Sequence, residues 1–213
     1  MKMLVGIAGR KRAGKDTAAD ALVWGLDFER MALADPLKAA AREIFGLSWE
    51  QTDGGLKETV DPRWAATPRQ ILQRLGTEGV REGFGGAMVK AGQWSPEDAA
   101  QTWVRALMVR AEGHPRVVVP DVRFANEAEA ILSRGGLLLV VHRPGLLDAD
   151  DHPSEREMEA ARPDLERRFP GQIDRLLNAG SVEGLHRLAV SAVERWQGEP
   201  EERQAQIDLL GGG

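Results

Sequence analysis

The residues best suited to chemistry lie near the amino terminus, where a glycine-rich turn leads into a lysine and a threonine. The segment GRKRAGKDT at positions 9–17 follows the apolar run MLVGIA and precedes an alanine-rich stretch. Glycines let the backbone curl until successive N–H groups face one point, and a following helix directs its positive end there. The pattern predicts a strand, a phosphate-binding loop and a helix, with a small phosphate compound as ligand.

This loop departs in one position from the common form of a phosphate loop. Asp16 follows Lys15 where Ser or Thr is usual, and the hydroxyl group comes one residue later at Thr17. The GKxT spacing resembles that of nucleoside monophosphate kinases. The resemblance implies that Lys15 contacts the β- and γ-phosphates of ATP, and that Thr17 or Asp16 faces Mg²⁺ directly or through water. The alternative is an ordinary glycine-rich turn between a strand and a helix.

Around this loop, the apolar runs predict an α/β fold. Five of them have the length of strands, at residues 2–8, 28–33, 116–119, 137–142 and 173–177. Helical patterns lie between them, of which the first covers 16–26 and the last covers 182–196 with Ser181 as N-cap. Strands that alternate with helices indicate a parallel sheet covered on both faces. Ligands of such a sheet bind beyond the carboxyl ends of the strands, where we expect four residues to gather, namely Gly9, Asp35, Asp121 and Arg143.

The interval from 35 to 114 is too long for a simple crossover and carries its own helix signals. Three pairs join a capping side chain to a proline suited to the first helical position: Asp35–Pro36, Thr67–Pro68 and Ser95–Pro96. We expect Gln70 to complete a capping box with Thr67, and Asp98 only to add negative charge to the first turn of its helix. The predicted organisation is a core of residues 1–34 and 115–196 with a lid at about 143–156, a helical insertion at 35–114 and a flexible tail at 197–213.

Composition limits the classes of site and partner. A net charge of −5 gives no general attraction to nucleic acid, although Arg10, Lys11 and Arg12 concentrate positive charge at the loop. The chain has no cysteine, which excludes disulfides and thiolate metal sites. The first apolar stretch is too short to span a membrane and leads into the loop without a processing site, so we expect a cytoplasmic protein.

Several segments together resemble the deoxynucleoside monophosphate kinases of the bacteriophage type, within the P-loop monophosphate kinases. They are GRKRAGKDTAAD at 9–20, ADPLK at 34–38, TPRQILQRLGTEGVRE at 67–82, PDVRFANE at 120–127 and DHPSE at 151–155. The resemblance implies a three-layer P-loop fold with a five-stranded parallel sheet, a helical acceptor-binding insertion and a small lid. It also implies ATP and Mg²⁺ as cofactors and transfer of the γ-phosphoryl group to a deoxynucleoside 5′-monophosphate. The partners would be small nucleotides, and the protein would form no stable complex with nucleic acid or a membrane. It would be found in the host cytoplasm if it is viral, as a monomer or a homodimer.

Phosphoryl transfer requires positive charge around mutually repelling anions. We expect backbone N–H groups of one run to hold the ATP phosphates, the run being Lys11, Arg12, Ala13, Gly14, Lys15, Asp16 and Thr17. Lys15 and Arg143 are the predicted catalytic residues. Arg143 and Arg156 flank the predicted lid and would close over the phosphates, although exposed loop arginines are equally common.

Acceptor binding is expected to involve cations of the insertion. Arg69, Arg74 and Arg81 occur in one helical segment, and a guanidinium group suits bidentate capture of a phosphate. On a straight α-helix Arg81 would lie about 120° and Arg74 about 140° round from Arg69, so the three would not share a face. Arg69 and Arg81 match the family pattern and are preferred, with Lys38 as a further candidate. The alternative is that these are solvated helix charges.

The end of the third predicted strand carries further candidates. Asp121 would position Mg²⁺ or a water, or else cap the next helix. The resemblance implies that Arg123 contacts the acceptor, that Asn126 or Glu127 holds the loop, and that Glu155 acts in the lid and acceptor region.

Other polar and aromatic residues receive structural interpretations. His152, Ser154 and Glu155 lie too close in sequence to form a hydrolase triad without a nucleophile elbow. The histidines at 114, 142 and 186 lack the spacing of a metal site. Tryptophans 49, 64, 94 and 103 fall in the insertion, where packing is favoured over stacking on the acceptor base, especially for Trp103.

Two other functions are compatible with the loop. One is another small-molecule P-loop kinase, acting on dephospho-coenzyme A or phosphomevalonate, because the phosphate loop is common to all. The other is a nucleotide-dependent ATPase or switch. Members of that class usually show a hydrophobic run ending in two acids, or a basic surface, whereas here Pro120 and Asp121 end the strand and the chain is acidic.

Overall fold

The computed structural model describes residues 3–146 and 153–198, and all their side chains except those of 153–156. The described chain divides into two compact units. The first contains the residues up to 32 and from 111 onward, and the second contains residues 33–110.

The first unit is built on a five-stranded sheet in which all neighbouring strands are parallel. The strand order is β2-β3-β1-β4-β5. The bounds are Met3–Gly9 for β1, Glu29–Arg30 for β2, Arg116–Val119 for β3, Leu137–His142 for β4 and Ile173–Leu177 for β5. The last three strands match the predicted ranges, and the observed architecture confirms the predicted P-loop α/β fold with a five-stranded parallel sheet.

The second predicted strand, 28–33, is longer than the strand that forms. Phe28, Met31 and Leu33 are buried, as their apolar character predicts. Only Glu29 and Arg30 are paired as a strand, with Val117 and Val118 of β3. The Met31 N–H still donates to the Val118 carbonyl at 3.0 Å, and the chain then leaves the sheet. The apolar character of Phe28, Met31 and Leu33 therefore predicts that they are buried, but not which residues of this segment pair as a strand.

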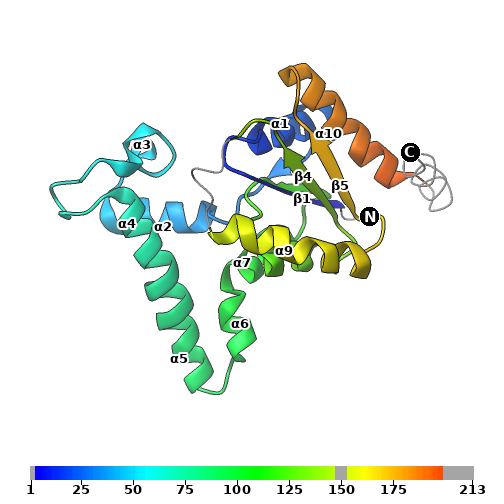
Figure 1. The fold of residues 1–213 in the computed structure, drawn as a ribbon. Helices are drawn as coiled ribbons and strands as arrows, with labels where there is room; N and C mark the ends of the chain where they lie inside the picture. Colours follow the sequence, from blue (N-terminus) through cyan, green and yellow to red (C-terminus); the bar gives the residue numbers. More distant parts are fainter. Residues whose placement is uncertain (1–2, 147–152, 199–213) are drawn as a thin grey trace. The chain divides into compact units, whose positions relative to one another are not determined.

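Helices cover both faces of the sheet, which gives three layers (Figure 1). α1 (Lys15–Leu26) and α10 (Val182–Gln197) lie on one face, and α9 (Pro153–Arg168) lies on the other with α8 (Ala125–Leu132). The core under α1 and α10 joins central strand residues such as Ile7 and Leu139 to small helix residues such as Ala18 and Ala189. Small side chains on both helices permit close packing, so the amino end of α1 is firmly held.

The second unit is helical. Its α-helices are α2 (Asp35–Phe45), α3 (Trp49–Thr52), α4 (Pro68–Arg74), α5 (Gly85–Lys90), α6 (Pro96–Ala100) and α7 (Thr102–Arg110). A 3₁₀ turn, η1 (Gly55–Glu58), follows α3, and a π-helical segment, η2 (Leu75–Phe84), joins α4 to α5. A small core of Ala41, Leu47 and Ile71 lies among α2 and α4.

The residues at the observed helix starts can be compared with the predicted caps. Thr67 and Gln70 form the expected capping box, with N–H to oxygen distances of 2.9 and 3.2 Å. The expectation for Asp98 is wrong, because its carboxylate accepts the Ser95 N–H at 2.9 Å and completes a second box. The expected cap at Asp35 is also wrong, since α2 starts one residue earlier and Ala34 is the N-cap.

Candidate functional site

The phosphate-loop segment connects the end of β1 to the start of α1. Gly9 has φ +144°, and a Cβ there would lie 2.4 Å from the Val141 carbonyl oxygen, so no side chain fits. Gly14 is the N-cap of α1 with φ +107°, a conformation that glycine adopts without strain. The two glycines of the motif are therefore fixed by backbone geometry as well as by ligand chemistry.

Ala13 is held at both of its backbone polar groups. Its N–H donates to the Arg10 carbonyl at 3.0 Å, and its carbonyl accepts from Asn178 Nδ2 at 2.8 Å. Asn178 follows β5, and its own N–H donates to the His142 carbonyl at 2.7 Å. Sequence reasoning missed Asn178; the signal was its position directly after the last strand, at the sheet end that also carries Gly9.

Lys15, the first residue of α1, turns back over the loop. Its ammonium group donates to the carbonyl oxygens of Gly9 at 2.6 Å and Arg10 at 2.9 Å. These oxygens carry only partial charge, whereas phosphate oxygens carry full charge and make stronger hydrogen bonds with an ammonium group. The arrangement keeps a cation at the loop that an anion could attract away from the two carbonyls.

Asp16 and Thr17 occupy the first turn of α1. The Asp16 carboxylate accepts from Arg30 of β2, which also donates to Asp20 at 2.8 Å. The Asp16 side chain is 79% exposed, while Thr17 is half-buried. Carboxylate and hydroxyl oxygens are ligands that Mg²⁺ accepts, and nucleotide sites need only one or two protein ligands because phosphates supply others. The residues present fit Mg²⁺, with Asp16 shared with a guanidinium group.

A cavity of about 330 Å³ lies beside the loop. Its cationic lining side chains are Arg12, Lys15 and Arg143, and the last follows β4 and is exposed. Lys11 is exposed and does not line this cavity. The cavity combines glycine backbone, cations and the positive end of α1, which is the environment that attracts an anion.

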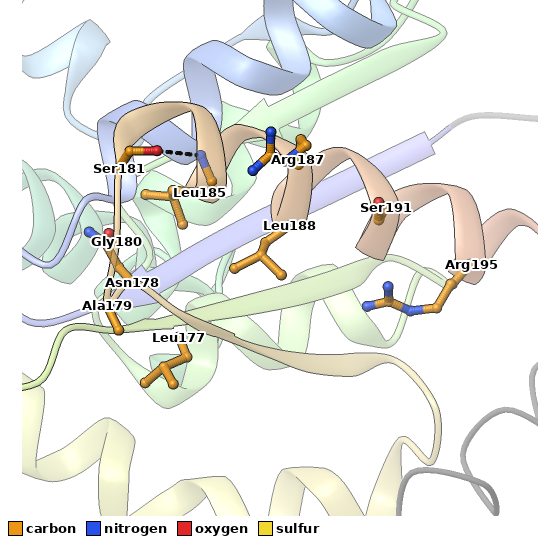
Figure 2. A pocket seen from close by; sticks show the side chains of 11 residues that line it. Leu177, Asn178, Ala179, Gly180, Ser181, Leu185, Arg187, Leu188, Ser191 and Arg195 are labelled. Carbon is orange, nitrogen blue, oxygen red and sulfur yellow. Dashed lines mark hydrogen bonds between the residues drawn. The ribbon is translucent and has the colours of Figure 1, made fainter.

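A second cavity of about 410 Å³ adjoins the first and shares Asn178, Gly180 and Leu185 with it. Its lining comes from the end of β5, from the loop that follows it and from one face of α10 (Figure 2). Ser181 starts that helix as predicted, with its hydroxyl accepting the Gly184 N–H at 3.1 Å. The lining mixes leucines with Ser181 and Arg187, so it could accept a ring with polar edges.

Glu127 holds the loop after β3. Of the two residues expected to do so, Asn126 and Glu127, the second is confirmed. Glu127 Oε2 accepts the N–H groups of Arg123 at 2.7 Å and Phe124 at 3.1 Å. Burial, and to a lesser extent the negative charge of Asp121, raises the pKa of Glu127, while the two N–H groups and the charge of Arg123 lower it. The result is a pKa of about 7. The alternative role of Asp121 as a helix cap is wrong, because the N-cap of α8 is Phe124.

Within the second unit, two of the expected acceptor cations are engaged with carboxylates. Lys38 Nζ donates to Asp53 Oδ1 at 2.6 Å, and Arg69 Nε donates to Glu58. Burial alone would raise the pKa of Asp53, but hydrogen bonds from Lys38 and Thr52 outweigh it and hold that pKa below its usual value. Both cations are thus placed by a carboxylate partner that an incoming phosphate would have to displace.

Arg81 differs from these two, because its Nε is buried and makes no hydrogen bond within the described part of the chain. It lies in η2, where hydrogen bonds run from i to i+5 and each residue turns the chain less than in an α-helix. The separation of about 120° between Arg69 and Arg81 holds for a straight α-helix, and it does not apply to this segment because η2 is π-helical. Arg74 ends α4 and is exposed.

Two of the tryptophans expected to pack make ring contacts in the second unit, since Trp64 meets Phe45 edge to face and Trp94 meets Phe84 in the same way. Trp103 is half-buried and donates from Nε1 to the Gly76 carbonyl at 3.2 Å. Trp49 is 64% exposed.

The comparisons with known proteins can be set against this geometry. No family model matches the chain. A curated protein of Acanthamoeba polyphaga mimivirus, named "Putative deoxynucleotide monophosphate kinase", is 41% identical over 163 residues, which are 75% of this chain and 84% of that protein.

The chain belongs to the deoxynucleotide monophosphate kinase family. It is therefore a nucleotide kinase, as its motifs imply.

Solved structures similar to this kinase include a dephospho-CoA kinase from Campylobacter jejuni and TT1252 from Thermus thermophilus. The first is 14% identical and covers 92% of this chain and 97% of its own, with a TM-score of 0.46. The second is 22% identical, and the match covers 92% of this chain and 99% of that protein's chain, with a TM-score of 0.43.

Some expected features of the kinase fall outside the described residues. The predicted lid at about 143–156 includes residues 147–152, which lie outside them, as do the side chains of Glu155 and Arg156. The tail from 199 also lies outside. Among the described residues, no group of three or more His, Cys, Asp or Glu side chains is arranged so that it could hold a metal ion. No helix in the described part of the chain is long and apolar enough to cross a membrane.

Proposed function

We propose that this kinase transfers the γ-phosphoryl group of ATP to the 5′-phosphate of a deoxynucleoside monophosphate, giving ADP and a deoxynucleoside diphosphate. The observation that carries the proposal is the loop at residues 9–17, in which Lys15 starts α1 beside a cation-lined cavity of about 330 Å³. The name of the mimivirus relative supports the deoxynucleotide as acceptor.

The protein's contribution is to bind and neutralise charge, because the acceptor phosphate is already a nucleophile. Lys15 exchanges the carbonyls of Gly9 and Arg10 for phosphate oxygens of ATP, and loop N–H groups from Lys11 to Thr17 bind the remaining charge. Arg143, which lines the same cavity, adds positive charge at the transferring group. The adjoining cavity beside α10 accommodates the nucleoside part of ATP.

Mg²⁺, when bound, neutralises charge on the β- and γ-phosphates. Thr17 would hold the ion through its hydroxyl group. Asp16 would act through water, since Arg30 already donates to its Oδ1. Asp121, after β3, is the third oxygen donor proposed to position the ion or its water.

The acceptor phosphate is bound by cations, for which we propose Lys38, Arg69, Arg81 and Arg123, with Glu155 as a further acceptor-side residue. Arg81 has the clearest physical reason among them. A buried donor without a partner costs about 1–3 kcal/mol, and an anion at Nε would remove that cost.

The experiment that tests this function is an ADP-release assay with Mg·ATP across a panel of acceptors. The panel contains deoxy- and ribonucleoside monophosphates, dephospho-coenzyme A and phosphomevalonate, and a parallel series contains DNA without monophosphate. We expect turnover with deoxynucleoside monophosphates and none with DNA alone. Preferred turnover of dephospho-coenzyme A or phosphomevalonate, or ATP hydrolysis that requires DNA and ignores monophosphates, would replace this proposal.

A further inference from the structure

We propose that Asn178 is a positioning residue for the phosphate loop, which fixes the peptide between Ala13 and Gly14 so that the Gly14 N–H faces the ATP phosphates. This inference rests on the proposed function, because it assigns to one side chain the orientation of a nucleotide-binding amide. Asn178 lies 165 residues from Ala13 in the sequence, and no motif of the chain points to it.

The first step of the argument is the anchoring of Asn178 itself. Its backbone N–H donates to His142, the last residue of β4, and it directly follows Leu177, the last residue of β5. His142 and Leu177 are partners in the sheet register. Asn178 therefore starts from the rigid carboxyl ends of two paired strands, and its side chain can hold another segment in place.

The second step is the geometry of a peptide group. A trans peptide is planar, so the carbonyl of one residue and the N–H of the next point in opposite directions. The described chain has no cis peptide. When Asn178 Nδ2 holds the Ala13 carbonyl at 2.8 Å, it directs the Gly14 N–H away from Asn178. The Ala13 N–H is held by Arg10 at 3.0 Å, so the preceding peptide is also fixed and the orientation is retained.

The third step is the fit between Asn178 and Gly14. A Cβ on Gly14 would lie 2.7 Å from Asn178 Nδ2 and 2.9 Å from Leu185 Cδ2. Ala13 and Leu185 are buried, with exposed fractions of 1% and 2%. The loop is thus packed against the amide and α10 without room to rotate, and glycine at 14 admits this contact as well as the positive φ.

The charge of the side chain also matters. An amide donates to the carbonyl without adding net charge beside a triphosphate. A carboxylate of the same shape would meet the Ala13 oxygen with an acceptor instead of a donor, and would repel the phosphates. Asn178→Asp therefore reverses the interaction with little change in volume, while Asn178→Ala removes it.

The experiment compares these two variants with Gln172→Ala in the full-length kinase. Gln172 is a matched control because its amide donates to the carbonyls of Leu132 and Gly136, each at 2.8 Å, just before β5 begins. Calorimetry measures the Kd of Mg·ATP, the ADP-release assay measures KM for ATP and for the acceptor, and thermal unfolding measures stability. Wild-type protein is titrated first.

We expect Asn178→Ala to weaken Mg·ATP binding and raise KM for ATP by about tenfold, since a buried carbonyl loses its partner. Asn178→Asp should have a larger effect, on the order of 100-fold, and KM for the acceptor should stay within about twofold in both. Gln172→Ala should lower stability and leave ATP affinity unchanged. The isosteric Asn178→Asp variant supplies the measurement if Asn178→Ala does not fold.

Two outcomes separate the inference from the function it rests on. Wild-type protein that does not bind Mg·ATP would overturn the proposed function. Wild-type binding that is retained in both Asn178 variants would overturn the positioning role alone. The same result follows if KM for ATP and KM for the acceptor rise equally, or if Gln172→Ala reproduces the loss of ATP affinity, because the side chain would then serve only general stability.

Discussion

At the scale of single residues, Lys15 has a partner before any nucleotide arrives. Its ammonium group lies on the carbonyls of Gly9 and Arg10. Binding of a triphosphate therefore exchanges two neutral acceptors for charged ones and requires no desolvation of an isolated cation. The same group then follows the charge that develops during transfer.

Lys15→Ala is expected to lower kcat by about 10²-fold or more, as does the loss of one transition-state donor in other enzymes. The ADP-release assay measures kcat, and circular dichroism confirms that the variant folds. Lys90→Ala is the control, since Lys90 is an exposed lysine at the end of α5. Near wild-type turnover in Lys15→Ala would remove Lys15 from the catalytic assignment.

Arg69→Ala is expected to raise KM for the monophosphate about tenfold and to leave KM for ATP unchanged, because a lost charge-assisted contact affects only the ligand it binds. Arg74→Ala, a change of an exposed arginine five residues further along, should behave as wild type. Steady-state kinetics with each substrate varied in turn gives both constants. If Arg69→Ala weakens ATP and spares the acceptor, the assignment is refuted.

Glu127 makes stability depend on pH in a defined direction. Burial raises its folded-state pKa from 4.5 to about 7, so between these values the folded protein keeps a proton that the unfolded chain releases. The stability that this group contributes is fully present below pH 4.5 and is lost as pH rises through about 7. In urea unfolding between pH 4.5 and 8, the free energy of unfolding of Glu127→Gln should fall less than that of wild type. Parallel curves for the two proteins would contradict the raised pKa.

At the scale of elements, the sequence predicted the features that depend on neighbouring residues in the chain. The ranges of β3 to β5 and the capping box of α4 depend on apolar runs and on residues three apart, and both were predictable. No range was predicted for α9, which is strongly polar and contains Pro163. The π-helical form of η2 and the contact of Asn178 with Ala13 depend on tertiary packing, which no local pattern encodes.

The cap of α4 gives a prediction at this scale. Thr67→Ala removes the side chain that accepts the Gln70 N–H at 3.2 Å, and should cost about 1 kcal/mol of unfolding free energy. Thr77→Ala, in η2 and exposed, is the control and should change stability by less than about 0.5 kcal/mol. Denaturant unfolding measures both. Equal stability of the two variants would show that the capping box contributes nothing at this helix.

At the scale of the whole molecule, the proposed ATP-binding loop lies in the first unit, whereas three of the residues proposed to bind the acceptor, Lys38, Arg69 and Arg81, lie in the second. Mg·ATP is expected to slow amide hydrogen exchange in the first unit, around residues 9–17 and 178–185, because ligand binding stabilises the segments that it contacts. A deoxynucleoside monophosphate alone should slow exchange within residues 33–110. Exchange followed by mass spectrometry distinguishes them, and protection by the monophosphate confined to residues 9–17 would contradict the assignment.

The margins of the sheet have a consequence for handling the protein. One outer strand, β2, consists of only Glu29 and Arg30, and the other, β5, carries Asp174 and Arg175. Short or charged outer strands resist the addition of a strand from a neighbouring molecule. We therefore expect little edge-to-edge aggregation in concentrated solutions of the protein, so spectroscopy at high protein concentration should be practicable.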